Sequence, residues 1–139
     1  MTDHLGKMAA CATDKDLSKA IEAHQKQTAA QRDELDALLK VQGREVNAHE
    51  DSSMHAIIAE AEKWNGMIVG DTIRDAALVA SLQRMEHYEM AVLGTLASWA
   101  RKLGQGEDEA VLSHILEQTR EADAEFSAIA KDALKTAVV

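Results

Sequence analysis

The sequence predicts an all-α protein in which long helices pack against one another as an up-down bundle, forming a single domain over residues 1–139. Two observations lead to this prediction. Proline is absent and aromatic residues are few, so the chain has little from which to build a sheet. Apolar residues also recur at spacings of three and four along three long stretches, which places them on one face of a helix.

The chain starts with a short predicted helix over residues 5–12, in which Leu5, Met8 and Ala9 share a face. So short a helix is not stable alone and must dock on the rest of the chain. Cys11 lies on an apolar face of this helix, and we expect it to be a small buried side chain. As the one cysteine, it cannot form a disulfide within the chain.

The second helix is predicted over residues 15–42, ending at Gly43. Its stripe is apolar at both ends but polar in the middle, at His24, Thr28 and Gln31. A buried polar group without a partner costs about 1–3 kcal/mol. Either these three side chains meet partners on facing helices, or this face is solvated at mid-length and alanines of the same helix supply a weaker core face.

A long crossover connects this helix to the next long one. Residues 44–52 are polar and irregular, and Asp51, Ser52 or Ser53 can cap a shorter helix over residues 54–65. A glycine-bounded link over residues 66–70 follows. We therefore expect a crossover that carries one short helix.

The longest stripe predicts a helix from Asp71 or Thr72 to Leu103. In order, its positions are Asp75, Val79, Leu82, Glu86, Glu89, Leu93, Leu96, Ala100 and Leu103. Two carboxylates thus stand where two core side chains would be expected.

The last helix is predicted over residues 108–134, after a tight reversal at residues 104–106. Its apolar stripe is interrupted at mid-length by Gln118 and Thr119. Antiparallel packing brings mid-points level, so we expect the polar interruptions of the three long helices to gather in one layer.

Two chemistries fit such a layer. Glu86 and Glu89 lie on one helix face and would repel each other if buried, unless one takes a proton or a cation neutralises both. Four-helix bundles hold pairs of metal ions between such carboxylates. Alternatively, the layer is a satisfied polar network that sets helix register, with the carboxylates bonded to protonated His24 or to the hydroxyl and amides of Thr28, Gln27, Gln31 and Gln118. Spacing alone leaves both open.

Two segments of the long central helix resemble the YciF-like ferritin-like proteins, a family of bacterial stress-associated four-helix bundles. They are Ile73-Arg-Asp-Ala-Ala-Leu-Val-Ala and Gln83-Arg-Met-Glu-His-Tyr-Glu-Met-Ala, followed by Gly94-Thr-Leu. The resemblance extends over nearly the whole chain. It implies a ferritin-like bundle whose first helix is truncated in this sequence.

The resemblance also implies a di-iron site, but with most of its acids replaced. The family's first-helix glutamate would precede Met1, its second-helix glutamate falls on Gln27, and its last-helix acidic pair falls on Gln118 and Thr119. Glu86 and Glu89 remain, and His24 matches a family histidine. Glutamine is a neutral, weak metal ligand, so we expect no full dinuclear centre.

These observations favour a non-catalytic structural or stress-associated bundle with a degenerate site and no cofactor. The alternative is a protein or oxidase that binds iron or another divalent ion through Glu86, Glu89 and His24. A third possibility is an adaptor that binds another protein through apolar residues, with Trp64, Met67, Ile68 and Trp99 as candidates.

Composition sets further expectations about partners and location. The net charge of −9 argues against nucleic acid and anionic membranes as partners, because both would be repelled by an acidic surface. The same surface can attract cations. The N-terminus lacks the apolar run of a signal peptide, so we expect a cytoplasmic protein. A short first helix would leave a groove partly uncovered, so we expect a homodimer.

Overall fold

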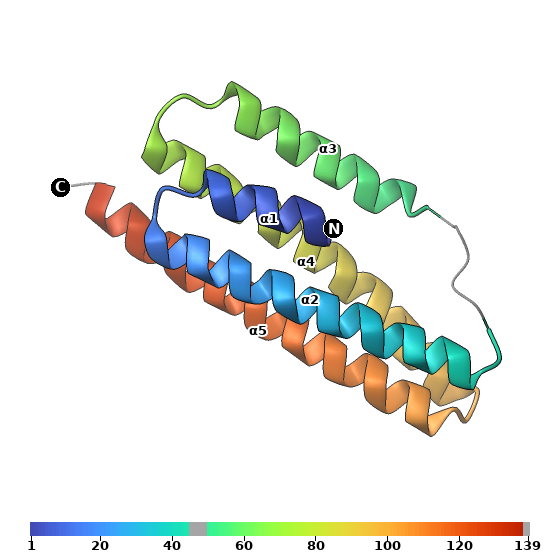
Figure 1. The fold of residues 1–139 in the computed structure, drawn as a ribbon. Coiled ribbons are helices and arrows are strands. Elements are labelled where there is room, and N and C mark those ends of the chain that lie inside the picture. Colours follow the sequence, from blue (N-terminus) through green and yellow to red (C-terminus); the bar gives the residue numbers. More distant parts are fainter. Residues whose placement is uncertain (45–49, 138–139) are drawn as a thin grey trace.

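The computed structural model describes residues 1–44 and 50–137, except for the side chains of Thr72 and residues 132–137. The described residues form five α-helices and no strand (Figure 1). This confirms the all-α prediction. The helices are α1 (Thr2–Cys11), α2 (Lys15–Val41), α3 (Ser52–Met67), α4 (Asp71–Lys102) and α5 (Gly106–Ala137).

Local signals set most helix ends. Asp14 caps α2, since its carboxylate accepts hydrogen bonds from the backbone N–H groups of Asp16 and Leu17. Asp51 caps α3 in the same way. At the start of α4, by contrast, the N-cap is Gly70, whose φ of 113° is strained for other residues, and no side chain caps this helix.

The bundle consists of four helices and one outlying helix. The two longest, α4 and α5, pack along each other, while α2 packs on α5 and α1 on α2 (Figure 1). The outlying helix, α3, lies against α4 within the crossover that carries the chain from the end of α2 back to the start of α4. The predicted crossover helix is therefore present, although it begins and ends two residues beyond the expected range.

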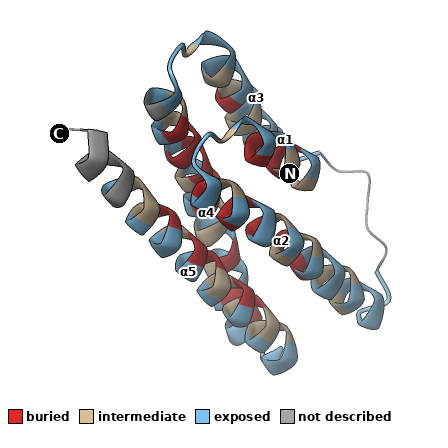
Figure 2. Cartoon of the chain, turned by 60° about the vertical axis from the view of Figure 1, so that its left-hand side comes forward, coloured by how far each residue is buried: buried red, intermediate tan, exposed pale blue. Residues whose placement is uncertain are grey.

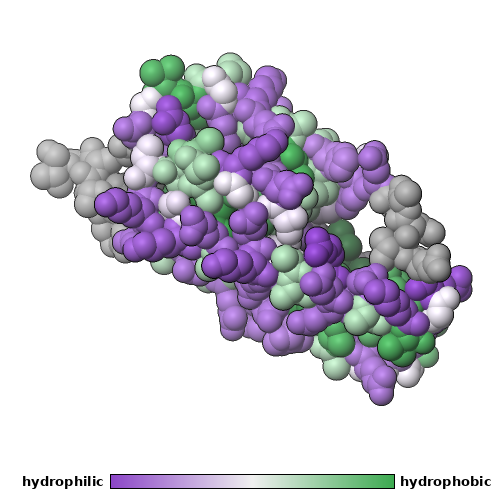
Figure 3. Space-filling model, in the orientation of Figure 1, coloured by the Kyte–Doolittle hydropathy of each residue, from purple (hydrophilic) through white to green (hydrophobic). Residues whose placement is uncertain are grey.

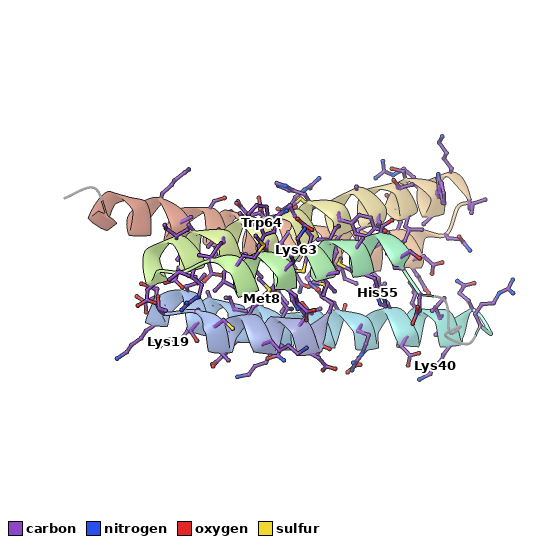
Figure 4. The ribbon with its side chains drawn as sticks, turned by 90° about the horizontal axis from the view of Figure 1, so that it is seen from above. Met8, Lys19, Lys40, His55, Lys63 and Trp64 are labelled. Atoms are coloured by element: carbon purple, nitrogen blue, oxygen red, sulfur yellow. The ribbon has the colours of Figure 1, made fainter. Side chains whose placement is uncertain are left out.

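The core is divided along the length of the bundle (Figure 2). The larger apolar cluster joins α1 to the first halves of α2 and α4 and to Phe126 of α5. In this cluster Met8 of α1 is fully buried; Figure 4 labels it between the surrounding helices. A smaller cluster lies at the other end, between Leu93 of α4 and Ile115 of α5. Between the two clusters lies a polar stretch.

Three side chains depart from the predicted burial. Leu96 and Leu103 belong to the predicted apolar stripe, but both are exposed. The reason is that the far half of α4 turns Leu93 and Ala100 toward α5, whereas no described helix covers Leu96. Cys11 is also exposed, because it is the last residue of α1 and lies at the edge of the buried face formed by Leu5 and Met8.

None of the described helices is long and apolar enough to cross a membrane.

Candidate functional site

The polar layer predicted from the three long helices is present, between the two apolar clusters. Its buried members come from α2, α4 and α5 and include His24, Thr28, Gln31, Glu86 and Thr119. Contacts join α2 to α4 at His24 and Glu86, and α2 to α5 at Gln31 and Gln118. The alternative of a solvated α2 face is therefore wrong at these positions.

The centre of the layer is a close pair between a histidine and a carboxylate. The Nε2 atom of His24 lies 2.7 Å from Oε1 of Glu86, and the side chains are 4% and 0% exposed. The phenyl ring of Phe126 meets the imidazole in a perpendicular, edge-to-face arrangement, with ring centroids 5.5 Å apart and planes at 89°. Although the pair is close, neither side chain makes a hydrogen bond of acceptable direction to any described residue. The contact is therefore chiefly electrostatic.

Electrostatics favours the charged form of His24. Burial lowers the pKa of its imidazole, but the contact with Glu86, the charge of Glu89 and the neighbouring Gln27 together outweigh this effect. The net result is a pKa above the ordinary value of 6.5. The shift favours the protonated form of His24, which is one of the partners that the sequence analysis considered for the buried carboxylate.

Glu89 is in a different environment from Glu86, although both lie on the same face of α4. Glu89 is half-buried, and its carboxylate has no hydrogen bond or ion pair among the described residues. Burial, together with the negative charge of Glu86, raises its pKa from 4.5 to about 7. Close to neutral pH this side chain therefore holds a proton for much of the time.

The other polar members of the layer are satisfied without an external ligand. The Nε2 amide of Gln31 donates to Oε1 of Gln118 at 2.9 Å, and the Gln118 amide nitrogen lies 3.0 Å from Nε2 of His114. The hydroxyls of Thr28 and Thr119 donate to backbone carbonyls one turn earlier in their own helices. These amides and hydroxyls contribute no negative charge to the layer.

The donor set does not fit a dinuclear metal centre. Of the positions at which the resemblance places acids, Gln27, Gln118 and Thr119 carry neutral groups. Among the described residues, no group of three or more His, Cys, Asp or Glu side chains is arranged to hold a metal ion. Glu86 and His24 meet directly, and Glu89 lies beside them toward the surface.

An open groove adjoins the layer where Glu89 lies. Its volume is about 790 Å³, and it runs between α2 and α4 with the N-terminal end of α1 at one end. Figure 3 shows the opening, with hydrophobic side chains at its back. Its apolar lining is Met1, Leu35, Leu39, Met54, Val92, Leu93, Leu96 and Ile115.

The candidate adaptor residues do not form one surface. Trp64, Met67 and Ile68 lie at the end of α3, next to the start of α4 (Figure 4 labels Trp64). Trp99 is close to the opposite end of α4, roughly 40 Å away at the 1.5 Å rise of a helix.

Asp75 has a role that the sequence pattern did not reveal. Its carboxylate accepts hydrogen bonds from the backbone N–H of Thr13 at 2.8 Å, the Thr13 hydroxyl at 2.6 Å and the backbone N–H of Asp14 at 2.9 Å. It therefore fixes the turn between α1 and α2 to α4. The signal available in the sequence was an aspartate on an otherwise apolar stripe.

The chain resembles known proteins over nearly its full length. Residues 1–139 match the family described as Domain of unknown function (DUF892). The chain is 30% identical to Protein YciF of Escherichia coli (strain K12) over 131 residues, which is 94% of this chain and 79% of that protein.

Two solved structures share the fold. The structure of the E. coli stress protein YciF has a TM-score of 0.92 and 30% sequence identity, covering 96% of this chain and 85% of that one. The structure of YcfI, described as "a putative structural protein" from Rhodopseudomonas palustris, has a TM-score of 0.88 and 34% identity, covering 91% and 80%. The predicted resemblance to YciF-like proteins is confirmed, and the chain belongs to the family described as Domain of unknown function (DUF892).

Proposed function

We propose that this chain is a non-catalytic structural bundle protein associated with stress, in which a degenerate di-iron site serves as a metal-free polar layer. The relatives support the role, since one is described as a stress protein and another as a structural one. The observation that carries the proposal is the buried pair of His24 and Glu86 beside the amide pair of Gln31 and Gln118. At the positions where the resemblance places the family's acids, this chain carries the neutral groups of Gln27, Gln118 and Thr119.

In this proposal the layer sets the register of the helices. It lies between two apolar clusters, so sliding α4 by one turn along its neighbours would move Glu86 into apolar surroundings. Separating a buried carboxylate from its partner costs about 3–5 kcal/mol. The layer therefore disfavours alternative packings of helices whose apolar faces are otherwise similar along their length.

Elemental analysis tests the metal-free state directly. The protein, purified without chelator, is expected to contain no stoichiometric iron, manganese or zinc. A stoichiometric amount of any of the three would refute the proposal.

Glu86→Gln, melted with and without added Fe(II), Mn(II) or Zn(II), tests the layer itself. Above the pKa of His24 we expect the substitution to be neutral or stabilising, because it removes a charge from a buried site. Below that pKa it should destabilise, since protonated His24 loses its partner. Added metal should leave the melting temperature of the wild type unchanged. The exposed Glu125→Gln on α5 is the matched control and should show neither effect.

A second candidate is a protein that binds one divalent ion through Glu86, Glu89 and His24. It is favoured by the two ring nitrogens of His24 and the two carboxylate oxygens of Glu86, which make no hydrogen bond to a described residue. The groove at Glu89 would give an ion access to them. This candidate requires that metal raise the melting temperature of the wild type and that Glu86→Ala abolish the rise.

A further inference from the structure

A chain of three polar side chains runs from the surface of α5 into the polar layer. It begins at His114, which is exposed, and passes through Gln118 to the buried Gln31 of α2. The Nε2 amide of Gln31 donates to Oε1 of Gln118 at 2.9 Å, and Nε2 of Gln118 lies 3.0 Å from Nε2 of His114. The chain therefore connects a side chain that meets solvent with one inside the bundle.

The donors and acceptors of this chain must all point the same way. A glutamine amide has a donor end, the NH2 group, and an acceptor end, the carbonyl oxygen. Because the carbonyl of Gln118 accepts from Gln31, its NH2 group is the end that faces His114. Nε2 of His114 then has to accept, which requires a neutral imidazole with its proton on Nδ1. In this direction Gln31 donates into the chain and turns its carbonyl oxygen away from it.

Protonation of His114 makes this direction impossible. A protonated imidazole carries an N–H group at both nitrogens, so Nε2 would face the NH2 group of Gln118 and two donors would meet. Turning each amide over removes the conflict. Nε2–H of His114 then donates to Oε1 of Gln118, and Nε2 of Gln118 donates to Oε1 of Gln31. The reversed chain keeps both hydrogen bonds, and the first of them is strengthened by the charge of the imidazolium.

Charged side chains near the chain come from all three packed helices. On α5, Glu117 lies about one turn beyond His114 and pairs with Arg120 at 3.2 Å. On α2, Glu34 lies about one turn beyond Gln31. The charged side chains that α4 pairs with α5 are engaged elsewhere, His87 with Asp123 and Arg101 with Glu109. Among the described residues no carboxylate forms an ion pair with His114, so its contact with Gln118 is the one that protonation changes.

We propose that His114, Gln118 and Gln31 form a pH-sensitive relay, in which protonation of a surface histidine reverses the hydrogen bonds of a buried amide pair. Histidine is the side chain whose charge ordinarily changes between about pH 5 and pH 8. Reversal turns the NH2 group of Gln31, in place of its carbonyl oxygen, toward the space between α2 and α4 that Glu89 also lines. The acidity at the surface thus sets whether Gln31 presents a donor or an acceptor to the polar layer. This inference depends neither on a metal in the layer nor on what occupies that space.

Nuclear magnetic resonance on the full-length, ¹⁵N-labelled chain tests the relay. At about pH 8 we expect the ring nitrogen shifts of His114 to show the Nδ1–H tautomer, with a scalar coupling across the hydrogen bond from Nε2 of Gln118 to Nε2 of His114. At about pH 5 this coupling should vanish, because Nε2 of His114 then donates to an oxygen. The side-chain amide signals of Gln118 and Gln31 should shift with the same midpoint as the His114 ring.

His114→Gln separates protonation from packing. Glutamine keeps an amide at the surface end of the chain but does not change its charge with pH. The part of the Gln31 transition that follows His114 should therefore be lost. The control is His55→Gln, which changes an exposed histidine of α3 (Figure 4 labels His55) and should leave the Gln31 transition as in the wild type. Circular dichroism confirms that both variants remain folded.

Three results would overturn the proposal. His114 could carry its proton on Nε2 at about pH 8, or lack the coupling to Gln118, which would exclude the neutral chain. The Gln31 amide could stay unchanged through the His114 transition, which would mean that the protonated ring leaves Gln118 without reversing the amides. Finally, His114→Gln could keep the whole Gln31 transition, which would assign that transition to another titrating group.

Discussion

Replacing Glu89 by glutamine is expected to remove most of the pH dependence of stability between about pH 4.5 and pH 7. In the folded chain, burial and the charge of Glu86 raise the pKa of Glu89 from 4.5 to about 7. The folded state therefore binds this proton more tightly than the unfolded state does. The resulting stabilisation is fully present below the ordinary pKa of 4.5 and is lost as the pH rises through the folded-state pKa of about 7.

The magnitude follows from the two pKa values. Their difference of about 2.5 pH units corresponds to about 3 kcal/mol, at 1.36 kcal/mol for each unit. Because the carboxylate reaches the open groove, solvent screens part of this energy, and we expect about 1–2 kcal/mol. Glutamine cannot ionise, so Glu89→Gln should match the wild type near pH 4.5 and exceed its stability by this amount at pH 8.

His24 adds to the pH dependence in the same direction. Its pKa is raised in the folded chain, so its stabilisation is present below 6.5 and is lost as the pH rises through the folded value. Glu89→Gln should therefore keep a smaller loss of stability at the alkaline end, where His24 gives up its proton.

Urea unfolding followed by circular dichroism, at pH 4.5 and pH 8 and constant ionic strength, measures both effects. The exposed Glu125→Gln is the control and should shift the wild-type curve little at either pH. If Glu89→Gln changed the free energy of unfolding equally at both pH values, the stabilisation by the Glu89 proton would be disproved.

Two further predictions concern residues that hold the larger apolar cluster and its turn in place. Asp75→Asn should lower the free energy of unfolding by about 1–3 kcal/mol, because an amide cannot accept all three hydrogen bonds from Thr13 and Asp14. Urea unfolding measures this loss. A change of less than about 0.5 kcal/mol, which is usual for a surface substitution, would contradict the role of Asp75. Phe126→Ala should lower the free energy of unfolding by about 3–5 kcal/mol, because removing the fully buried ring leaves a cavity against His24. Thermal melts at pH 7 measure this loss. A loss below about 1 kcal/mol would show that the neighbouring side chains collapse into the cavity.

Periodicity was sufficient to predict the helices and the layer. The spacing of apolar residues located the long helices, and the interruptions at His24, Glu86 and Gln118 lay level once the helices packed antiparallel. This succeeded because the same spacing that defines a helix face also fixes which side chains it presents to its neighbours.

Periodicity did not predict burial correctly where a side chain lies on the apolar stripe but no described helix packs against it. Leu96 has the same spacing as the buried Leu93, but among the described helices it is Leu93 that packs against α5, whereas Leu96 is 38% exposed. Nor could a local pattern show that the carboxylate of Asp75 accepts bonds from a turn 62 residues away from it. Both facts depend on how distant segments meet, which no short window of sequence contains.

The carboxylate of Asp75 also has a consequence for the order in which the fold opens. It is the anchor of the turn that joins α1 to α2, and α1 alone is too short to persist as a helix. We therefore expect amide hydrogen exchange in α1 to proceed by local release of this helix, whereas the amides of α4 and α5 exchange only when the whole bundle unfolds. Each such release would briefly extend the open groove along α2 into the near half of the bundle.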